Sequence, residues 1–423
     1  MEITIQKYFQ KMKSLIIIVC SVILFSCNGT GRNTKSYQKH NSMTNDITSQ
    51  YGYNRDFLKS YAKIIELTNN NASVLIVPQW QGRVMTSTAD GDSGYSFGWI
   101  NHDLIASGKI QPHINPFGGE ERIWLGPEGG QYSIFFRKGQ EFIYDNWQTP
   151  AFIDTMPYEL VNLTDFSATF RIDARVENYS GTSFNFRIER TVTLLGSHQI
   201  NRVTGIDTEG LKIVAYRSDN TLINMGKEEW KKETGLLSVW MLGMYNPSPG
   251  VVVAIPYKAG DEKKAGPPVN DNYFGKIPSG RLKVTGTHIF FKADGTMRGK
   301  IGIPPLRAKG VMGSYDSQNN FLTLVICNMP EGITEYVNSA WQIQKDPYSG
   351  DALNSYNDGP LEDGSLMGPF YELETSSPAA ALKPGESLTH VQYTLHITGS
   401  REKIDLAARK ILETSIDEIS GAF

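Results

Sequence analysis

The segment Phe166–Val176, FSATFRIDARV, alternates apolar and polar residues along its whole length. Residues two apart lie on the same face of a strand, so its apolar side chains would all face one side of a sheet. A turn at Tyr179–Thr182 follows, and the period of two resumes over Phe184–Ile188. The pattern predicts two long antiparallel strands with one buried face.

Strand signals continue through most of the chain, whereas helix signals are few. The 40 glycines and 20 prolines favour many turns. A short helix is expected over Asn54–Tyr61, and a single amphipathic helix after Ser400. No internal repeat of the kind found in propellers is visible. The prediction is an all-β fold, a large antiparallel β-sandwich with one C-terminal helix. Its further strands are expected at Ser73–Val77, Arg83–Met85, Val251–Ile255, Leu322–Ile326 and Val391–Ile397.

The start of the chain is typical of an export signal. Basic residues at Lys7, Lys11 and Lys13 precede the apolar run Leu15–Phe25. The run is short for a membrane span, and Cys27 follows one residue after it. Leu24 to Cys27 resembles a bacterial lipobox, which implies cleavage before Cys27 and attachment of lipid to its sulfur. An uncleaved anchor or an ordinary signal peptide is the alternative.

Three regions follow from this interpretation. Residues 1–26 are expected to be a lipoprotein signal peptide, residues 27–50 a flexible polar tether, and residues 51–423 one folded domain. The protein would then be anchored by lipid in the bacterial cell envelope, at the outer membrane or the periplasmic face.

The charge and the cysteine content of the chain argue against some classes of partner and site. Removal of residues 1–26 takes away three lysines and Glu2, which leaves 38 basic and 43 acidic residues, a net charge of −5. This balance argues against a nucleic-acid partner. Cys327 lies alone in an apolar run and is expected to be a buried small residue, with no disulfide framework and no cysteine metal site. No nucleotide, zincin or hydrolase-elbow motif is present, so no cofactor is expected.

One segment, Gln111–Phe136, concentrates groups that suit a polyhydroxylated ligand. Two Gly-Gly pairs would let the backbone turn sharply or approach a ligand closely. We interpret the segment as the floor of a pocket. The alternative is a β-hairpin whose glycines make turns and whose arginine pairs with a neighbouring carboxylate. Its candidate residues are His113, Glu120, Glu121, Arg122, Trp124 and Glu128.

A second polar cluster lies between Asn338 and Asp358. Trp341, Asn354 and Tyr356 are the preferred contacts there, because amide and aromatic groups suit sugar hydroxyls and the apolar face of a pyranose. The alternative is a long loop held by its own Asx turns. The carboxylates of these segments could also hold Ca²⁺, but their spacing matches no EF-hand loop, so a metal has no support.

Three segments together resemble the galactose mutarotase (aldose 1-epimerase) superfamily: LTNNNASVLIVPQWQGRVMTS, GGEERIWLGPEGG and FYELETSSPAAALKPGESLTHVQYTLHI. The resemblance implies a β-supersandwich that binds sugars in a cleft. It also implies that Arg122 binds substrate, that Arg83 in the Gly-Arg turn contributes, and that Glu374 of Leu-Glu-Thr is a catalytic base. The best fit is with uncharacterised exported branches of the superfamily.

The sequence departs from the mutarotase pattern at the general acid. Mutarotases use a histidine on a central strand, but residues 202–257 contain no histidine. His113 is the best alternative acid because imidazole transfers protons near neutral pH, and His102 is a weaker rival. His390 and His396 are expected on the surface or the cleft rim. Glu374 also has a structural alternative, since Glu372 and Glu374 share a strand face that solvent could cover.

Three functions fit these observations. The first is a carbohydrate-active enzyme with epimerase-like proton transfer by a glutamate base. The second is a glycan-binding lipoprotein that has lost the acid. The third is a glycoside hydrolase or lyase on the same fold, which for a hydrolase needs two carboxyl groups across the cleft.

Overall fold

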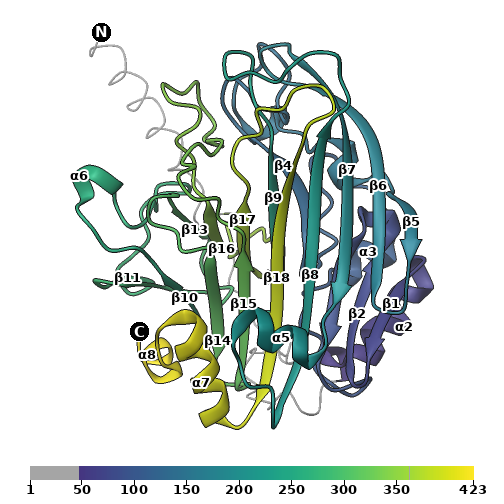
Figure 1. Ribbon diagram of the computed structural model, residues 1–423, viewed down its shortest axis with the longest axis vertical. Coiled ribbons are helices and arrows are strands. Elements are labelled where there is room, and N and C mark those ends of the chain that lie inside the picture. Colours follow the sequence, from purple (N-terminus) through teal and green to yellow (C-terminus); the bar gives the residue numbers. More distant parts are fainter. Residues whose placement is uncertain (1–46, 362) are drawn as a thin grey trace, which may run out of the picture. The chain divides into compact units, whose positions relative to one another are not determined.

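The computed structural model describes residues 47–361 and 363–423, and its largest element is a ten-stranded antiparallel sheet (Figure 1). The long strand pairs predicted from the alternating pattern lie here, with β6 and β7 joined over eleven residue pairs from Ser167↔Thr193 to Glu177↔Ser183. In order across the sheet the strands are β11 (Leu282–Val284), β12 (His288–Lys292), β10 (Val251–Pro256), β14 (Val311–Asp316), β15 (Phe321–Cys327), β18 (Ser387–Gly399), β8 (Leu211–Asn224), β7 (Ser183–Leu194), β6 (Ser167–Glu177) and β5 (Glu159–Leu163).

Two smaller antiparallel sheets pack against this one. Their strands are linked where Val84 and Glu121 exchange backbone hydrogen bonds. The five-stranded sheet has the order β13 (Gly299–Ile303), β16 (Leu353–Asn357), β17 (Tyr371–Ser376), β9 (Ser238–Tyr245) and β4 (Arg122–Gly126), and the three-stranded sheet the order β1 (Ile65–Asn69), β2 (Ala72–Val77) and β3 (Arg83–Thr88).

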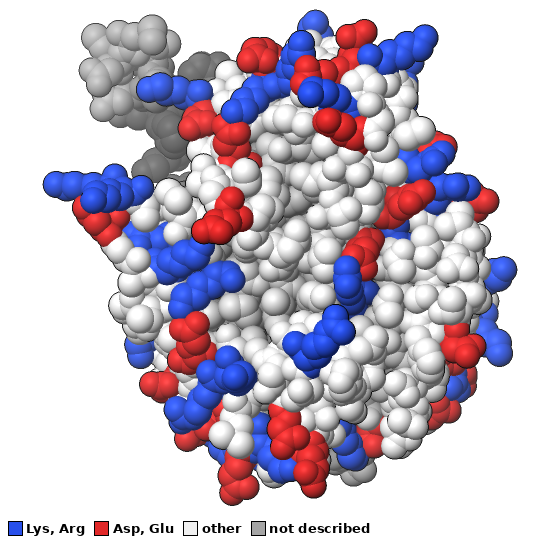
Figure 2. Space-filling model, viewed as in Figure 1, with Lys and Arg blue, Asp and Glu red and all other residues white. Residues whose placement is uncertain are grey.

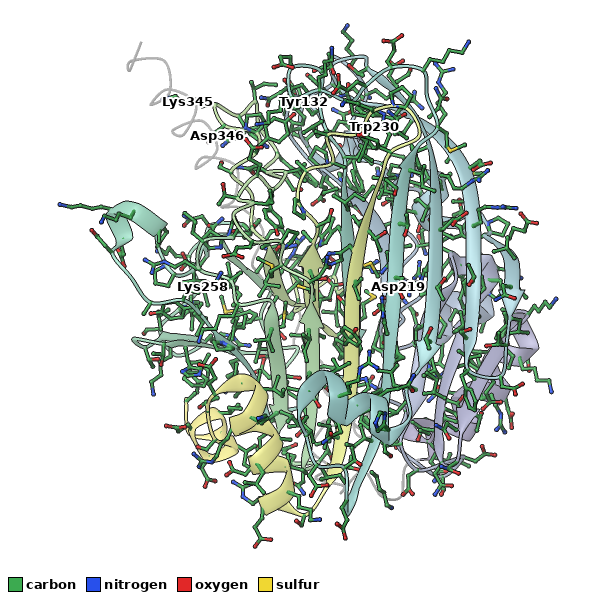
Figure 3. The ribbon with its side chains drawn as sticks, viewed as in Figure 1. Tyr132, Asp219, Trp230, Lys258, Lys345 and Asp346 are labelled. Carbon is green, nitrogen blue, oxygen red and sulfur yellow. The ribbon has the colours of Figure 1, made fainter. Side chains whose placement is uncertain are left out.

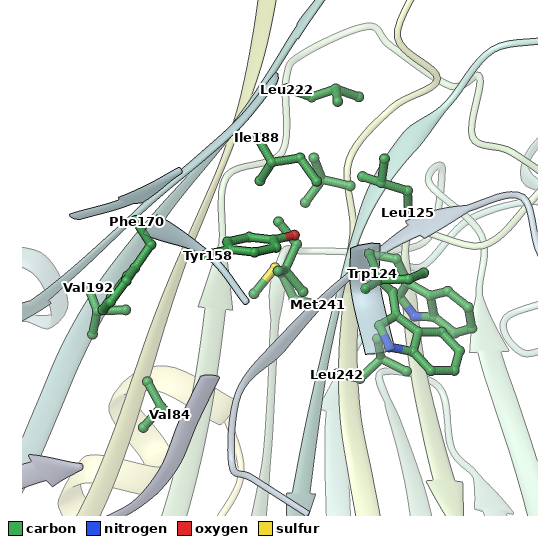
Figure 4. Close-up of a cluster of buried hydrophobic side chains, with 14 of the residues drawn as sticks. Val84, Trp124, Leu125, Tyr158, Phe170, Ile188, Val192, Leu222, Met241 and Leu242 are labelled. Atoms are coloured by element: carbon green, nitrogen blue, oxygen red, sulfur yellow. The ribbon is translucent and has the colours of Figure 1, made fainter. Parts of the chain in front are cut away.

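The core lies between these layers. Phe170, Ile188 and Leu222 on the large sheet are fully buried in one cluster with Leu125 and Met241 of the five-stranded sheet (Figure 4). Removal of this much apolar surface from water is the main driving force for such a sandwich. The all-β antiparallel sandwich predicted from the sequence is therefore confirmed.

Helices are few and short. The predicted C-terminal helix is α7, where the Ser400 hydroxyl accepts from the Lys403 backbone N–H, and Ile404 and Leu412 are buried. A second short helix, α8, follows it, so the C-terminus carries two helices. The helical segments are η2 (Ile47–Ser49), α2 (Tyr51–Tyr61), η3 (Pro78–Trp80), α3 (His102–Ser107), η4 (Tyr144–Asn146), α4 (Ala151–Asp154), α5 (Ser197–Thr204), α6 (Glu262–Ala265), α7 (Arg401–Leu412) and α8 (Ile416–Ser420).

Charged side chains of both signs are interspersed over the face shown in Figure 2, and no large patch of one sign is visible on it. Within the described residues, no helix is long and apolar enough to cross a membrane. The expected signal peptide and Cys27 lie outside the described residues, as does most of the expected tether.

Cys327 is buried, as predicted, in the cluster that also contains Val325 and Leu353. Burial raises the pKa of its thiol to about 12. A thiol with so high a pKa is a poor nucleophile at neutral pH, and Cys327 is therefore a packing residue.

Candidate functional site

The five-stranded sheet has one face that packs on the large sheet and one that faces away from it. On β17, Tyr371 and Thr375 point to the large sheet, since their hydroxyls bond Ser314 on β14 and Gln392 on β18. Strand alternation therefore turns Glu372 and Glu374 to the opposite face. We call this opposite face the site face.

Neighbouring strands add further side chains to the site face through their register. Glu374 lies opposite Leu242 and Asn354, and Leu242 lies opposite Arg122. Directly paired residues in antiparallel strands share a face. The register thus collects on one surface the side chains of Arg122, Trp124, Trp240, Lys300, Asn354, Tyr356, Glu372 and Glu374.

Glu374 is the centre of this group and is fully buried. Its Oε2 accepts from Trp240 Nε1 at 2.9 Å and from the Lys300 ammonium at 2.8 Å. Its Oε1 is buried and has no hydrogen-bond partner among the described residues. Burial lowers the pKa of Lys300, but the adjacent Glu374 and Glu128 carboxylates outweigh this, and the net pKa is raised. One carboxylate oxygen is therefore held in place by two donors, while the other has no donor among the described residues.

Glu372 is the second carboxylate of β17, and it pairs with Arg122 at 2.6 Å. Burial raises the pKa of Glu372 to about 7, although the Arg122 charge opposes that shift. The guanidinium also lies over the Trp124 ring, 4.8 Å from its centroid. The pairing predicted for Arg122 as the structural alternative exists, but its partner comes from a strand far along the chain.

Glu128 lies just beyond the end of β4 and is partly exposed. Burial raises the pKa of Glu128 to about 7, and the Glu374 charge adds to this, while Lys300 and the indoles of Trp341 and Trp147 oppose it. The charges of Lys300 and Glu374 therefore act on the Glu128 carboxyl. A carboxyl with a pKa near 7 can donate or accept a proton at neutral pH.

Tryptophans line the same region. Trp124 meets Trp240 edge to face at 5.5 Å between ring centroids, and Trp147 stacks on Trp341 at 6.0 Å. Trp341 is 36% exposed, whereas Trp240 is buried. The exposed Trp341 ring suits the apolar face of a sugar ring.

On the other side of Glu374, Asn354 belongs to a polar chain. Its amide donates to the Tyr273 hydroxyl at 3.0 Å, and that hydroxyl donates to Asp351. Burial raises the pKa of Asp351. The Lys300 ammonium lies 5.5 Å from the Tyr273 ring centroid and 4.8 Å from that of Trp240. These contacts hold Lys300 between two aromatic rings.

Tyr356 lies opposite Glu372 on the neighbouring strand, β16. Its hydroxyl donates to Asp358 at 2.6 Å, and its ring packs in a small cluster with Trp99, Met244 and Phe370. We call this cluster the Trp99 cluster. Tyr356 therefore belongs to the site face, at the side where that face meets the Trp99 cluster.

Two loops hold the end of the sheet near Glu128. The Glu128 backbone N–H donates to the Ser339 hydroxyl at 3.1 Å, and the Gln131 side-chain amide donates to the Gln344 carbonyl and accepts from the Gln344 backbone N–H. Tyr132 and Lys345, from the same two loops, lie at one end of the sheets in Figure 3. The loops thus fix the backbone positions of both Glu128 and Trp341.

Three predicted ligand contacts are separated from the site face and need correction. Glu121 is fully buried, where it pairs with Arg190 at 2.7 Å and accepts from Gln392. Alternation explains this position, because Arg122 faces the site and its neighbour must face the large sheet.

The other two are Glu120 and Arg83. Glu120 is fully buried, with Oε2 3.4 Å from His396 Nε2. Arg83 is 1% exposed and donates to the Gly118 carbonyl at 2.9 Å. These two residues and Glu121 are each paired with a partner that lies away from the site face.

The histidines lie away from Glu374. His113 is partly buried, its Nδ1 is 2.6 Å from the Trp147 carbonyl oxygen, and no contact joins it to Glu374 in the described residues. His102 Nε2 lies 2.7 Å from Asn54 Oδ1. His390 and His396 were expected at the surface or cleft rim, but they are 1% and 0% exposed. His390 bonds Thr375 of the five-stranded sheet and His396 bonds Thr323 of the neighbouring strand, both in the interior, which reverses that expectation.

Several site residues were missed by the sequence analysis, above all Lys300, Trp240 and Tyr273. Lys300 lies in a five-residue strand with glycines at positions 299 and 302, which gives little strand signal. Trp240 lies in β9, whose residues are all buried, so no alternation marks its face. Among the described residues, no group of three or more His, Cys, Asp or Glu side chains could hold a metal ion.

Both the sequence and the structure were compared with those of known proteins. A family model described as "Family of unknown function (DUF6786)" matches residues 49–423. A search of curated protein sequences finds no match.

Solved structures similar to the chain include a galactose mutarotase-like protein from Lactobacillus casei, with 10% identity, a TM-score of 0.48, and 79% of this chain and 100% of that chain covered. A galactose mutarotase related enzyme from Lactobacillus acidophilus has 11% identity and a TM-score of 0.43, with 80% and 97% covered. Both are similar to this chain in fold.

Proposed function

The chain belongs to the family of unknown function DUF6786, and on the geometry of its site we propose that it is a carbohydrate-active protein in which Glu374 accepts a proton from a sugar hydroxyl. The observation that carries this proposal is the asymmetry of the Glu374 carboxylate. Trp240 and Lys300 hold Oε2, whereas the buried Oε1 has no partner in the part of the chain that the structure describes. A hydroxyl group placed at Oε1 would complete its hydrogen bonding.

The reaction we propose is epimerase-like. Glu374 removes the proton of the anomeric hydroxyl, the bond between the anomeric carbon and the ring oxygen breaks, and a proton goes to the ring oxygen. The open-chain aldehyde then closes on its other face with the proton transfers reversed. We propose Glu128 as the donor of this proton, because burial and the nearby Glu374 charge raise its pKa to about 7.

His113 was the sequence-based candidate for this acid. Its Nδ1 is engaged by the Trp147 carbonyl oxygen, and its ring packs on Tyr144 at 4.6 Å. We therefore favour Glu128 as the donor and assign His113 the support of the loop that carries Trp147.

Other groups would orient the sugar. Arg122 Nε and Trp124 Nε1 are buried donors without partners among the described residues. The Trp341 ring offers an exposed surface for a pyranose face, and Asn354 and Tyr356 lie on the same site face. Each unsatisfied donor would gain a hydrogen bond from a bound hydroxyl, which is worth roughly 0.5–1.5 kcal/mol.

The experiment follows a panel of monosaccharides and oligosaccharides by proton NMR with the purified protein and with Glu374→Gln. We expect accelerated exchange between anomers, lowered roughly 10²- to 10⁴-fold in the variant by loss of the base. Glu177→Gln is the matched control, because Glu177 is exposed on the large sheet. Equal exchange rates with and without Glu374 would remove its catalytic role.

The other outcomes of the panel separate the alternatives. Line broadening of a sugar without turnover, equal in both proteins, would favour a glycan-binding protein. A new reducing end would favour a hydrolase, and an unsaturated product a lyase.

We also propose that lipid on Cys27 anchors the protein in a bacterial envelope membrane. This proposal is supported by the order of residues 7–27, in which basic residues come first, an apolar run follows and Cys27 comes last. Mass spectrometry of the mature N-terminus tests this directly, since a diacylglycerol-modified Cys27 is expected. Cleavage at another residue, or an unmodified Cys27, would contradict it.

A further inference from the structure

A hollow lies apart from Glu374, at the Trp99 cluster. It has a volume of about 550 Å³, which is within the range of small-molecule sites. The side chains that define its chemistry are those of Tyr53, Asn54, Tyr95, Trp99, His102 and Asn246. We call this hollow the Tyr53 pocket.

The Tyr53 pocket and Glu374 lie at different positions along β9. Leu242 lies opposite Glu374, and Asn246 is four residues further along the chain, or roughly 13 Å at strand spacing. Between them, the Trp99 ring packs 4.9 Å from the Phe370 ring, in the cluster that also contains Met244 and Tyr356. The Tyr53 pocket is therefore a site of its own.

The walls of the Tyr53 pocket are held by backbone and amide hydrogen bonds. Trp99 N–H donates to the Met244 carbonyl at 3.0 Å, and the Asn246 amide donates to the Ser96 carbonyl at 3.1 Å. On the side of α2, Tyr51 N–H donates to the Gly94 carbonyl at 2.9 Å. Walls tied at several points need little rearrangement to bind a ligand.

The lining contains no Lys, Arg, Asp or Glu side chain. The Asn54 amide donates to the carbonyls of Thr48 and Gln50, so its Oδ1 accepts from His102 Nε2 at 2.7 Å. This arrangement gives Nε2 of His102 a proton. Burial lowers the pKa of His102, which keeps the ring neutral at pH 7. The pocket therefore suits an uncharged ligand.

Aromatic side chains supply the remaining surface. Tyr53 is 39% exposed, and Trp99 and Tyr95 lie deeper. Aromatic faces beside amide and imidazole groups favour a ligand with apolar C–H faces and hydroxyl groups around its edge. We propose that the Tyr53 pocket is a second saccharide site, which takes one uncharged pyranose unit without help from Glu374.

The test uses three uncharged glycosides whose anomeric configuration is fixed: methyl β-D-glucopyranoside, methyl β-D-galactopyranoside and methyl α-D-mannopyranoside. Saturation-transfer NMR titrations are run on the full protein, on Tyr53→Ala and on Trp341→Ala. For at least one glycoside we expect a binding component that Trp341→Ala leaves intact and Tyr53→Ala weakens about tenfold, as loss of an aromatic contact predicts.

Tyr61→Ala is the matched control, because Tyr61 is an exposed tyrosine of the same helix outside the pocket. His102→Gln is a second pocket variant and decides the matter if Tyr53→Ala fails to fold, as judged by its melting curve. The proposal would be overturned if saturation transfer from the protein were seen for none of the three glycosides. Transfer that the pocket variants leave unchanged, or that Trp341→Ala abolishes, would also overturn it.

These outcomes are distinguishable from those at Glu374. Anomer exchange that is lost in Glu374→Gln and retained in Tyr53→Ala would support the proposed function whether or not the Tyr53 pocket binds. Glycoside binding that survives Glu374→Gln and is weakened in Tyr53→Ala would support the pocket even in a protein without turnover.

Discussion

Arg122 and Glu372 are 250 residues apart in the chain, yet their side chains meet at 2.6 Å and are only 5% and 7% exposed. The pair joins β4 to β17 across β9, which lies between them in the sheet. An ion pair in this position is isolated from water, so the loss of one partner leaves a buried charge without compensation.

We expect Arg122→Met to lower the free energy of unfolding by about 3–5 kcal/mol at pH 8, as measured by urea denaturation. The double variant Arg122→Met/Glu372→Gln should recover much of this loss, because no uncompensated charge remains. Arg171→Met is the control, since Arg171 pairs with Glu159 at an exposed position and should cost less than about 1 kcal/mol. Equal losses at the two arginines would contradict the prediction.

Glu128 and Glu372 should make stability fall as pH rises. The pKa of each is raised to about 7 in the folded protein from an ordinary value of 4.5. The folded state therefore binds protons more tightly, and the stability contributed by each group is fully present below pH 4.5 and lost as pH rises through 7.

Unfolding free energies measured between pH 4.5 and 8 check this, with a few kcal/mol expected per group at ~1.4 kcal/mol per pKa unit. Glu128→Gln should flatten the curve, whereas Glu177→Gln should leave its slope unchanged. An identical slope in wild type and Glu128→Gln would show that Glu128 titrates normally.

His390 should make stability fall as pH falls, opposite to the effect of Glu128 and Glu372. Burial lowers the pKa of His390 from 6.5 to about 4. The unfolded chain binds the proton more tightly, so the stability due to this group is present above pH 6.5 and lost as pH falls through 4. Thermal melts of His390→Gln between pH 7 and 4 should show a weaker loss than wild type. His198→Gln, at an exposed position, is the control and should behave as wild type.

Gly118 should tolerate no side chain. Its φ is +95°, and an added Cβ would lie 2.1 Å from the Trp99 carbonyl oxygen. We expect Gly118→Ala to destabilise by more than about 3 kcal/mol, because the packed backbone at Trp99 must move. Gly108 also has a positive φ, +62°, but open space around it, so Gly108→Ala should cost only about 1–2 kcal/mol. Similar melting temperatures for the two variants would refute this account.

The long strands could be predicted because their signal is local. In β6 the apolar residues recur at every second position from Ala168 to Val176. In β7 they recur from Phe184 to Leu194 with Arg190 as the exception, so each strand needs only its own sequence to show the pattern. The Ser400 cap of α7 is local in the same sense. These elements account for much of the large sheet and the C-terminal helix.

The candidate site could be predicted only in part, because its residues are brought together by pairing between distant strands. Glu374 and Arg122 were marked by motifs, but nothing near Lys300 in the sequence shows that its ammonium meets Glu374. The predicted surface positions of His390 and His396 were wrong for a related reason. His396 lies in an alternating strand whose polar face turns inward, where Thr323 supplies its partner. A sequence shows a polar residue but not the partner that allows its burial.

The strand order of the five-stranded sheet has a consequence for synthesis and folding. The sheet places β4, which begins at residue 122, two strands from β17, which ends at residue 376. Such pairings have high contact order, and their loop-closure entropy must be overcome before the sheet gains stability. A ribosome must therefore complete most of the polypeptide before Arg122 can meet Glu372, and until then the unpaired strand edges need protection from aggregation.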